Sequence, residues 1–186
     1  MATQKEINWI KEKLIEEANY LFSNKGLKIR IDDNVTVLPE AKMITTGCNG
    51  IYCGFRNEIQ IRRAMIGDVV FTYKFNQHLP LRQFWIFRRA LQTLIHERGH
   101  QVHFKVMGQE KVDVDYISSY GNKNNNEAFA VAFQEYVMDE NKNNDKLISV
   151  LERYNLYGNI EDENINNKKA SQEYEQELDE LGIEII

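Results

Sequence analysis

His96-Glu97-Arg98-Gly99-His100 is the stretch that decides the fold of this 186-residue chain. It follows apolar residues at helical spacing, so we place it inside a long amphipathic helix. Two histidines four residues apart lie one turn apart on the same helix face, and both imidazoles can reach a single metal ion. Glu97 lies one step round the helix, where its carboxylate can contact a water on that metal without being a ligand. The motif is therefore typical of a zinc hydrolase.

The helix around this motif is expected to run from Pro80 to about Met107. Proline is favourable in the first turn of a helix because its missing N–H has no partner there. An apolar stripe directly before the motif would hold the ligands rigid, and it consists of Phe84, Phe87, Leu91, Leu94 and Ile95.

Three further helices are predicted from the spacing of apolar residues, over 5–23, 126–139 and 145–157. Between residues 27 and 75, alternating apolar residues and β-rich runs are broken up by glycines. This pattern predicts three to five short strands in a mixed or mostly antiparallel sheet, and Val69-Val70-Phe71-Thr72-Tyr73 is one of the predicted strands.

A zinc hydrolase needs a third protein ligand besides the two histidines. A third histidine six residues after the second is excluded, because Val106 occupies that position. His103 follows His100 by three residues, which is too far along the helix to complete a tetrahedron. We interpret His103 as a helix-surface or supporting histidine, and His78 as a loop residue.

A carboxylate from the helix predicted over 126–139 is the remaining source of a ligand. Glu127 opens this helix, where the helix dipole favours a negative charge. Glu135 lies two turns further on and is rotated away by about a quarter turn at 3.6 residues per turn. We therefore predict that Glu127 joins His96 and His100 in binding one Zn²⁺ per chain.

The stretch from Tyr120 to Phe133 resembles the third-ligand segment of the anthrax lethal factor-like zinc peptidases, which include the secreted Pro-Pro endopeptidases. That family pairs H-E-x-x-H with a later Y-x₆-E-x-F-A-x-x-F segment, and both parts occur here in the same order. The family's tyrosine stands seven residues before the glutamate ligand, as Tyr120 stands before Glu127. The resemblance implies that the Tyr120 hydroxyl stabilises the oxyanion during catalysis.

The resemblance covers roughly residues 90–138 and departs from the family at Val131, where the family usually has an acidic residue. Gly99 within the motif agrees with the family, whereas Arg98 is less usual and is expected to face solvent. The family's substrates bind along a sheet edge above the metal, and 57–61 and 68–75 are the two candidate edges in this chain.

By this resemblance we expect an α+β, zincin-like fold of the gluzincin type. It would have an N-terminal helix, a small mixed or antiparallel sheet, a long active-site helix and a helical C-terminal part. Residues 1–157 would form the metallopeptidase domain, and 158–186 an acidic helix or tail packed on the same domain.

The expected function is that of a zinc-dependent endopeptidase acting on peptide or protein substrates, with Glu97 as the general base. The alternative is a catalytically silent zincin-like binding or structural module, for example one associated with a phage or a toxin. An intact Glu97 argues against that alternative. A spartan-type protease acting on DNA-crosslinked protein is disfavoured, because the net charge of −5 and the lack of Lys/Arg clusters argue against a nucleic-acid partner.

We expect a monomer that has no membrane partner. No run of about 18 apolar residues predicts a membrane helix, and the N-terminal residues lack the apolar core of a signal peptide. We expect a cytoplasmic protein, with a secreted mature form as the alternative. Cys48 and Cys53 are expected to be reduced thiols, and a local disulfide between them is the alternative.

Overall fold

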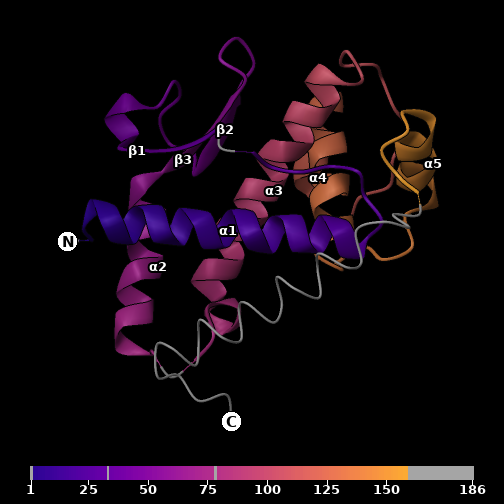
Figure 1. Ribbon diagram of the computed structural model, residues 1–186. Helices are drawn as coiled ribbons and strands as arrows, with labels where there is room; N and C mark the ends of the chain where they lie inside the picture. The colour runs from indigo at the N-terminus through magenta and orange to yellow at the C-terminus, as the bar shows by residue number, and fades with distance from the viewer. Residues whose placement is uncertain (1, 33, 78, 159–186) are drawn as a thin grey trace.

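The computed structural model describes residues 2–32, 34–77 and 79–158 of the chain, so the C-terminal segment predicted from 158 onward lies almost wholly outside the described residues. The described residues form a mixed α+β fold with a small sheet, as predicted (Figure 1). They comprise five α-helices and three strands. None of the described helices is long and apolar enough to cross a membrane. In chain order the described elements, with η marking a 3-10 turn, are α1 (Gln4–Asn24), β1 (Val35–Leu38), η1 (Glu40–Lys42), β2 (Gly50–Cys53), β3 (Glu58–Arg62), α2 (Arg63–Phe75), η2 (Leu81–Gln83), α3 (Trp85–Lys105), η3 (Ser119–Lys123), α4 (Asn125–Val137) and α5 (Asp145–Arg153).

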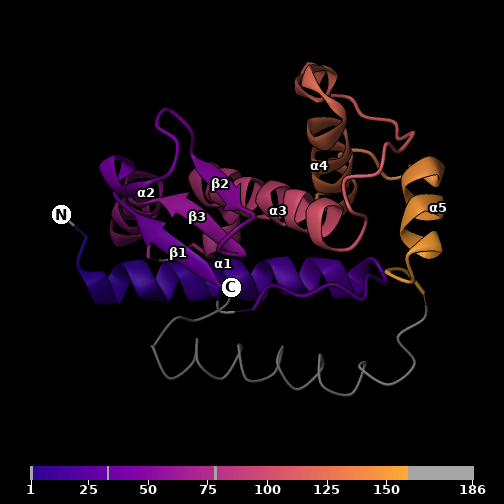
Figure 2. The same ribbon diagram turned by 90° about the horizontal axis from the view of Figure 1, so that it is seen from above.

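Helix α1 is the long packing helix predicted over 5–23, and it lies alongside the sheet and α3 (Figure 2). A capping box starts it: the Thr3 hydroxyl accepts the Glu6 N–H at 3.3 Å, and the Glu6 carboxylate accepts the Thr3 N–H at 2.7 Å. One face of the helix is buried in the core, through Ile7, Ile10, Leu14, Ala18 and Phe22.

The sheet is mixed, with strand order β1-β3-β2. Strand β1 pairs parallel with β3, and β2 pairs antiparallel with β3 through a short hairpin. Because β3 is the central strand, the predicted substrate edge at 57–61 is wrong. Among the described strands, β2 is the edge that packs on α3.

The strand predicted around Val69-Val70-Phe71-Thr72-Tyr73 is wrong as well, because Arg63–Phe75 form helix α2. The four buried residues of α2 are Met65, Ile66, Val69 and Val70, which follow helical spacing, whereas Phe71 is exposed. Burial of one helix face against α1 and α3 therefore overrides the β propensity of the run. The second candidate for a substrate edge, at 68–75, is lost with this strand.

Helix α3 carries the H-E-x-x-H motif, and it begins at Trp85 rather than at Pro80. Pro80 instead precedes the 3-10 turn η2, and Phe84 is extended between the turn and the helix. The two long faces of α3 have different neighbours. Gln101 and Phe104 point toward the β2–β3 hairpin, whereas Gly99 and His103 pack on α4.

Gly99 sets how closely α3 approaches α4. A Cβ at this position would lie 3.0 Å from Ala130 Cα and 3.3 Å from Phe133 Cδ1. Gly99→Ala should therefore lower the free energy of unfolding by about 1–3 kcal/mol through overpacking. Gly67, in α2, is the matched control because an added Cβ there would meet nothing within 4 Å.

Gly67→Ala should raise the free energy of unfolding by about 0.4–1 kcal/mol, since alanine restricts the unfolded chain. Denaturant titration of both variants beside the parent measures the two effects. An equal rise in stability for both variants would contradict the close contact between α3 and α4.

Candidate metal centre

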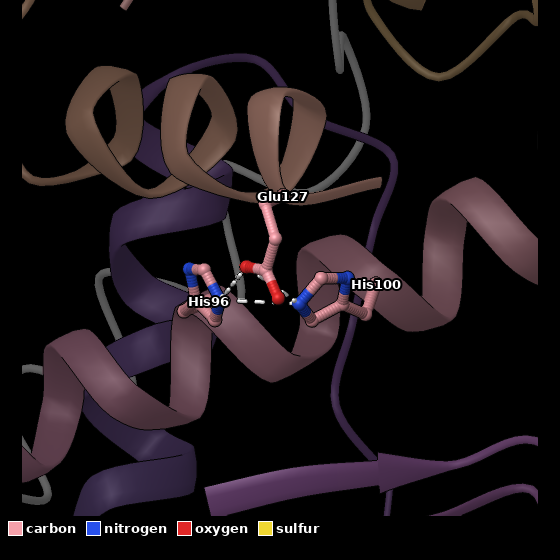
Figure 3. Close-up of side chains that lie close together, drawn as sticks. All are labelled: His96, His100 and Glu127. Carbon is pink, nitrogen blue, oxygen red and sulfur yellow. Dashed lines mark hydrogen bonds and ion pairs between the residues drawn. The ribbon is translucent and has the colours of Figure 1, made fainter. Parts of the chain in front are cut away.

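The two motif histidines and Glu127 meet where α3 lies side by side with α4 (Figures 1 and 3). His96 and His100 project from one face of α3, as their spacing predicts. Glu127 lies in the first turn of α4, which is the helix predicted over 126–139. The Asn124 side chain caps this helix by accepting the Glu127 N–H at 3.0 Å, so the cap fixes where Glu127 leaves the backbone.

The three candidate ligand atoms form a nearly equilateral triangle (Figure 3). His96 Nε2 lies 3.1 Å from His100 Nε2 and 3.2 Å from Glu127 Oε2, and His100 Nε2 lies 3.3 Å from the same oxygen. A tetrahedral zinc ion with bonds of about 2.0–2.1 Å separates its ligand atoms by about 3.3–3.4 Å. The donor set and its spacing therefore fit zinc closely.

The three side chains are partly open to solvent, with exposed fractions of 16% for His96, 18% for His100 and 19% for Glu127. Solvent therefore reaches part of each of the three side chains, and a catalytic zinc site needs such access for its water ligand. Burial raises the pKa of Glu127, but the bonds to His100 and His96 outweigh it and hold that pKa at about 2. Glu127 is therefore a carboxylate at neutral pH, which is the form that binds a metal.

Glu97 lies on the sheet-facing side of α3, outside the ligand triangle. It is buried, and its Oε2 accepts the Tyr52 backbone N–H of β2 at 2.8 Å. Gly50 makes this approach of β2 to α3 possible, because a Cβ there would lie 2.6 Å from Thr93 Cγ2 and 3.0 Å from Glu97 Cγ. Burial raises the pKa of Glu97, although the neighbouring histidines and the Tyr52 N–H oppose that rise.

Tyr120 lies on the short 3-10 turn η3, which directly precedes α4. Its ring centroid is 5.9 Å from that of His96, and the two rings meet edge to face at 68°. The Lys123 ammonium lies over the Tyr120 ring, 3.6 Å from the ring centroid. The structure therefore brings Tyr120 next to a candidate ligand while leaving the side chain 44% exposed.

His103 and Glu135 lie outside the ligand triangle, and both have buried side chains that form hydrogen bonds. The helix-surface interpretation of His103 is wrong, because its side chain is buried and stacks on Phe129 at 5.0 Å. Its Nε2–H donates to the Glu110 carbonyl at 2.8 Å, and burial lowers its pKa. Glu135 is also buried, and its carboxylate binds backbone amides of the segment before η3.

A polar network that ties α3 to the β2–β3 hairpin was not foreseen from the sequence. The buried Gln101 donates from Nε2 to Asn57 Oδ1 at 2.9 Å, and the Tyr52 hydroxyl donates to the same oxygen at 3.2 Å. Arg98 Nη1 donates to Gln101 Oε1, so the expectation that Arg98 simply faces solvent is wrong. Asn57 has a positive φ of 51°, which asparagine tolerates better than most residues, but no pattern in the sequence pointed to its bonds with Gln101 and Tyr52.

The two cysteines have no part in the ligand triangle. Both Cys48 and Cys53 are free thiols, as predicted. Burial and then the charge of Glu97 raise the pKa of the Cys48 thiol. Among the described residues, His96, His100 and Glu127 form the group of metal-ligand type found by geometry.

Comparison with protein-family models, with curated proteins and with solved structures gave no match for this chain. Two features of the chain itself bear on its function. They are the order and spacing of the motif residues along the sequence, and the triangle that three of these residues form in space.

Proposed function

We propose that this chain is a zinc-dependent endopeptidase whose metal is held by His96, His100 and Glu127. The observation that supports this best is the triangle of ligand atoms with sides of 3.1, 3.2 and 3.3 Å. Each imidazole Nε2 carries at most one proton, which can point along only one side of the triangle. Hydrogen bonds therefore cannot satisfy all three sides at once, whereas one cation at the centre of the site does.

Zinc is the metal that the donor set favours, because two imidazole nitrogens and one carboxylate oxygen with an accessible fourth side are typical of catalytic zinc sites. When bound there, zinc supplies Lewis acidity, which lets water ionise near neutral pH and polarises a carbonyl group. The chain's own residues supply the proton transfers and the remaining charge stabilisation.

Glu97 is the general base in this proposal. The Tyr52 N–H holds one carboxylate oxygen, so the side chain keeps a single orientation beside the histidines. The carboxylate removes a proton from the attacking water and delivers that proton to the leaving amine. Burial supports this role, because a raised pKa makes Glu97 a stronger base than an exposed carboxylate.

Strand β2 replaces the two substrate edges predicted from the sequence. It is the edge strand that packs on α3 beside Glu97, and the Tyr52 N–H points out of the sheet edge toward that carboxylate. We propose that an extended peptide lies along this edge, where backbone hydrogen bonds bind it with little regard to sequence.

Tyr120 is the residue that donates to the oxyanion, and Tyr120→Phe tests the proposed function. The variant should keep its zinc, because the phenol is not a ligand, while kcat falls by about 10²- to 10³-fold through loss of one oxyanion donor. Zinc content and cleavage of a peptide library, with products identified by mass spectrometry, measure both quantities.

Tyr116→Phe is the matched control, because Tyr116 belongs to the same segment and its hydroxyl bonds to Asn122 rather than facing His96. It should cleave the library at close to the parental rate. Equal rates for Tyr120→Phe and the parent would remove Tyr120 from the mechanism, and a parent that cleaves nothing while loaded with zinc would reject the peptidase.

A further inference from the structure

Glu135 is a buried carboxylate that the proposed mechanism does not use. It lies on α4 two turns beyond Glu127, and its side chain is 3% exposed. Oε2 accepts the Ile117 N–H at 2.7 Å, and Oε1 accepts the Ser118 N–H at 2.7 Å. Within the described part of the chain, both hydrogen bonds to this carboxylate come from the backbone. The two backbone bonds offset the cost of burying this polar side chain.

We propose that Glu135 is a positioning residue, which fixes Tyr120 beside the metal centre by holding the backbone of Ile117 and Ser118. The inference rests on the proposed role of Tyr120. Helix α4 then contributes two carboxylates to the site. Glu127, at the start of the helix, is a metal ligand, and Glu135, near its end, anchors the segment that carries the oxyanion donor.

Ser118 connects the carboxylate to Tyr120. Its N–H is held by Glu135, and its hydroxyl accepts the Tyr120 N–H at 3.3 Å, which caps the turn η3. Its carbonyl accepts the Gly121 N–H at 3.1 Å. Three groups of this one residue thus link the buried carboxylate to the turn in which Tyr120 lies.

Apolar burial does not hold this segment in place, because residues 117–120 are all exposed and Ile117 is 70% exposed. Polar contacts hold it instead. Just before it, the Asn144 side chain donates to the Asp115 carbonyl at 2.6 Å. The two bonds of Glu135 therefore anchor the backbone from the protein interior two and three residues before Tyr120.

The geometry requires a carboxylate rather than an amide. Each Glu135 oxygen accepts a different N–H, whereas glutamine offers one acceptor oxygen and would turn its NH₂ group toward the other N–H. Glu135→Gln therefore keeps the size of the side chain but removes one of the two bonds. Glu152→Gln is the matched control, because Glu152 is exposed on α5.

The position of Tyr120 can be monitored by ¹⁹F NMR, which needs no activity assay. In protein labelled with 3-fluorotyrosine, the Tyr120 ¹⁹F resonance is assigned by its loss in Tyr120→Phe. In the metal-free protein, Glu135→Gln should shift or broaden this resonance, and Glu152→Gln should leave it in place. An unchanged Tyr120 resonance in folded Glu135→Gln would overturn the proposal.

Activity supplies the second readout. Glu135→Gln should lower kcat by about 10- to 100-fold through misplacement of Tyr120, with KM and zinc content unchanged. The double variant with Tyr120→Phe should be no slower than Tyr120→Phe alone, because both changes remove the same donor. Fully additive losses would overturn the positioning role.

Two further outcomes have a defined meaning. If the parent cleaves no peptide, the proposed function fails, whereas the ¹⁹F spectra of the metal-free variants still decide the position of Tyr120. If Glu135→Gln does not fold by circular dichroism, Ser118→Ala removes the next bond of the same chain of contacts, from the Tyr120 N–H to the Ser118 hydroxyl, and leaves both Glu135 bonds in place. Ser118→Ala should then displace the Tyr120 resonance, and an unchanged resonance would overturn the proposal.

Discussion

Glu127→Ala should abolish most of the zinc binding of the protein. The parent, purified without chelator, is expected to carry about one zinc per chain, and the variant far less. Loss of a residue that only orients a ligand weakens metal binding by about 10- to 100-fold, so loss of a ligand should raise the zinc Kd by more than about 100-fold. Elemental analysis and competition with a chromophoric chelator measure the content and the Kd.

The effect is large because Glu127 is the one ligand that α4 contributes to the site. Without it, the two histidines on α3 remain as a pair, which holds zinc poorly. His103→Gln is the control for a nearby imidazole outside the triangle, and it should keep the parental zinc content. Full zinc and an unchanged Kd in Glu127→Ala would show that Glu127 is not a ligand.

Glu97→Gln should separate metal binding from catalysis. Glutamine keeps an oxygen that can accept the Tyr52 N–H, so β2 should stay on α3 and the zinc content should stay at the parental level. Turnover should fall by about 10²- to 10⁴-fold, because the amide cannot accept the proton of the attacking water. Elemental analysis and the peptide-library assay on the same preparations measure the two properties.

The outcomes of this experiment distinguish the competing functions. A zinc-loaded parent that cleaves peptides and a zinc-loaded Glu97→Gln that does not are the results expected of the peptidase. Zinc in both forms and turnover in neither would favour the catalytically silent binding module. Equal turnover in both forms would exclude Glu97 as the base.

Helices α1 and α4 were predictable from the sequence, whereas α2 was not, although it too buries one face. The apolar spacing of 5–23 and 126–139 gives α1 and α4 to within a few residues, because burial in the core selects the same period that the sequence shows. The ends of α3 were less predictable. Pro80 starts a 3-10 turn rather than the helix, and that choice depends on how Leu81 and Phe84 pack in the core.

The errors in the sheet have a physical origin in long-range contacts. Val69 and Val70 fit a strand by propensity, but their burial beside Met65 and Ile66 favours a helix that covers the core. The central position of β3 depends on its parallel pairing with β1, which is separated from it by β2 in the sequence. Pairing of this kind leaves no local pattern along the chain.

In the candidate site, too, the residues placed by local sequence patterns were predictable, whereas the contacts made over long range were not. His96, Glu97 and His100 follow from local spacing, and Glu127 from its position at the start of a helix. The bonds of Glu135 to Ile117 and Ser118 were not predictable, because they depend on how an irregular segment folds back onto α4. Supporting contacts to loops carry no periodicity, so they become visible only in three dimensions.

Zinc K-edge X-ray absorption of the purified parent is the decisive test of the proposed metal centre, because it reports which atoms surround the metal. Binding by His96, His100 and Glu127 predicts a shell of nitrogen and oxygen atoms at about 2.0–2.1 Å, with imidazole scattering and no sulfur. A sulfur atom at about 2.3 Å would point to a cysteine ligand instead. Either that result or an absence of zinc from the protein would contradict the account.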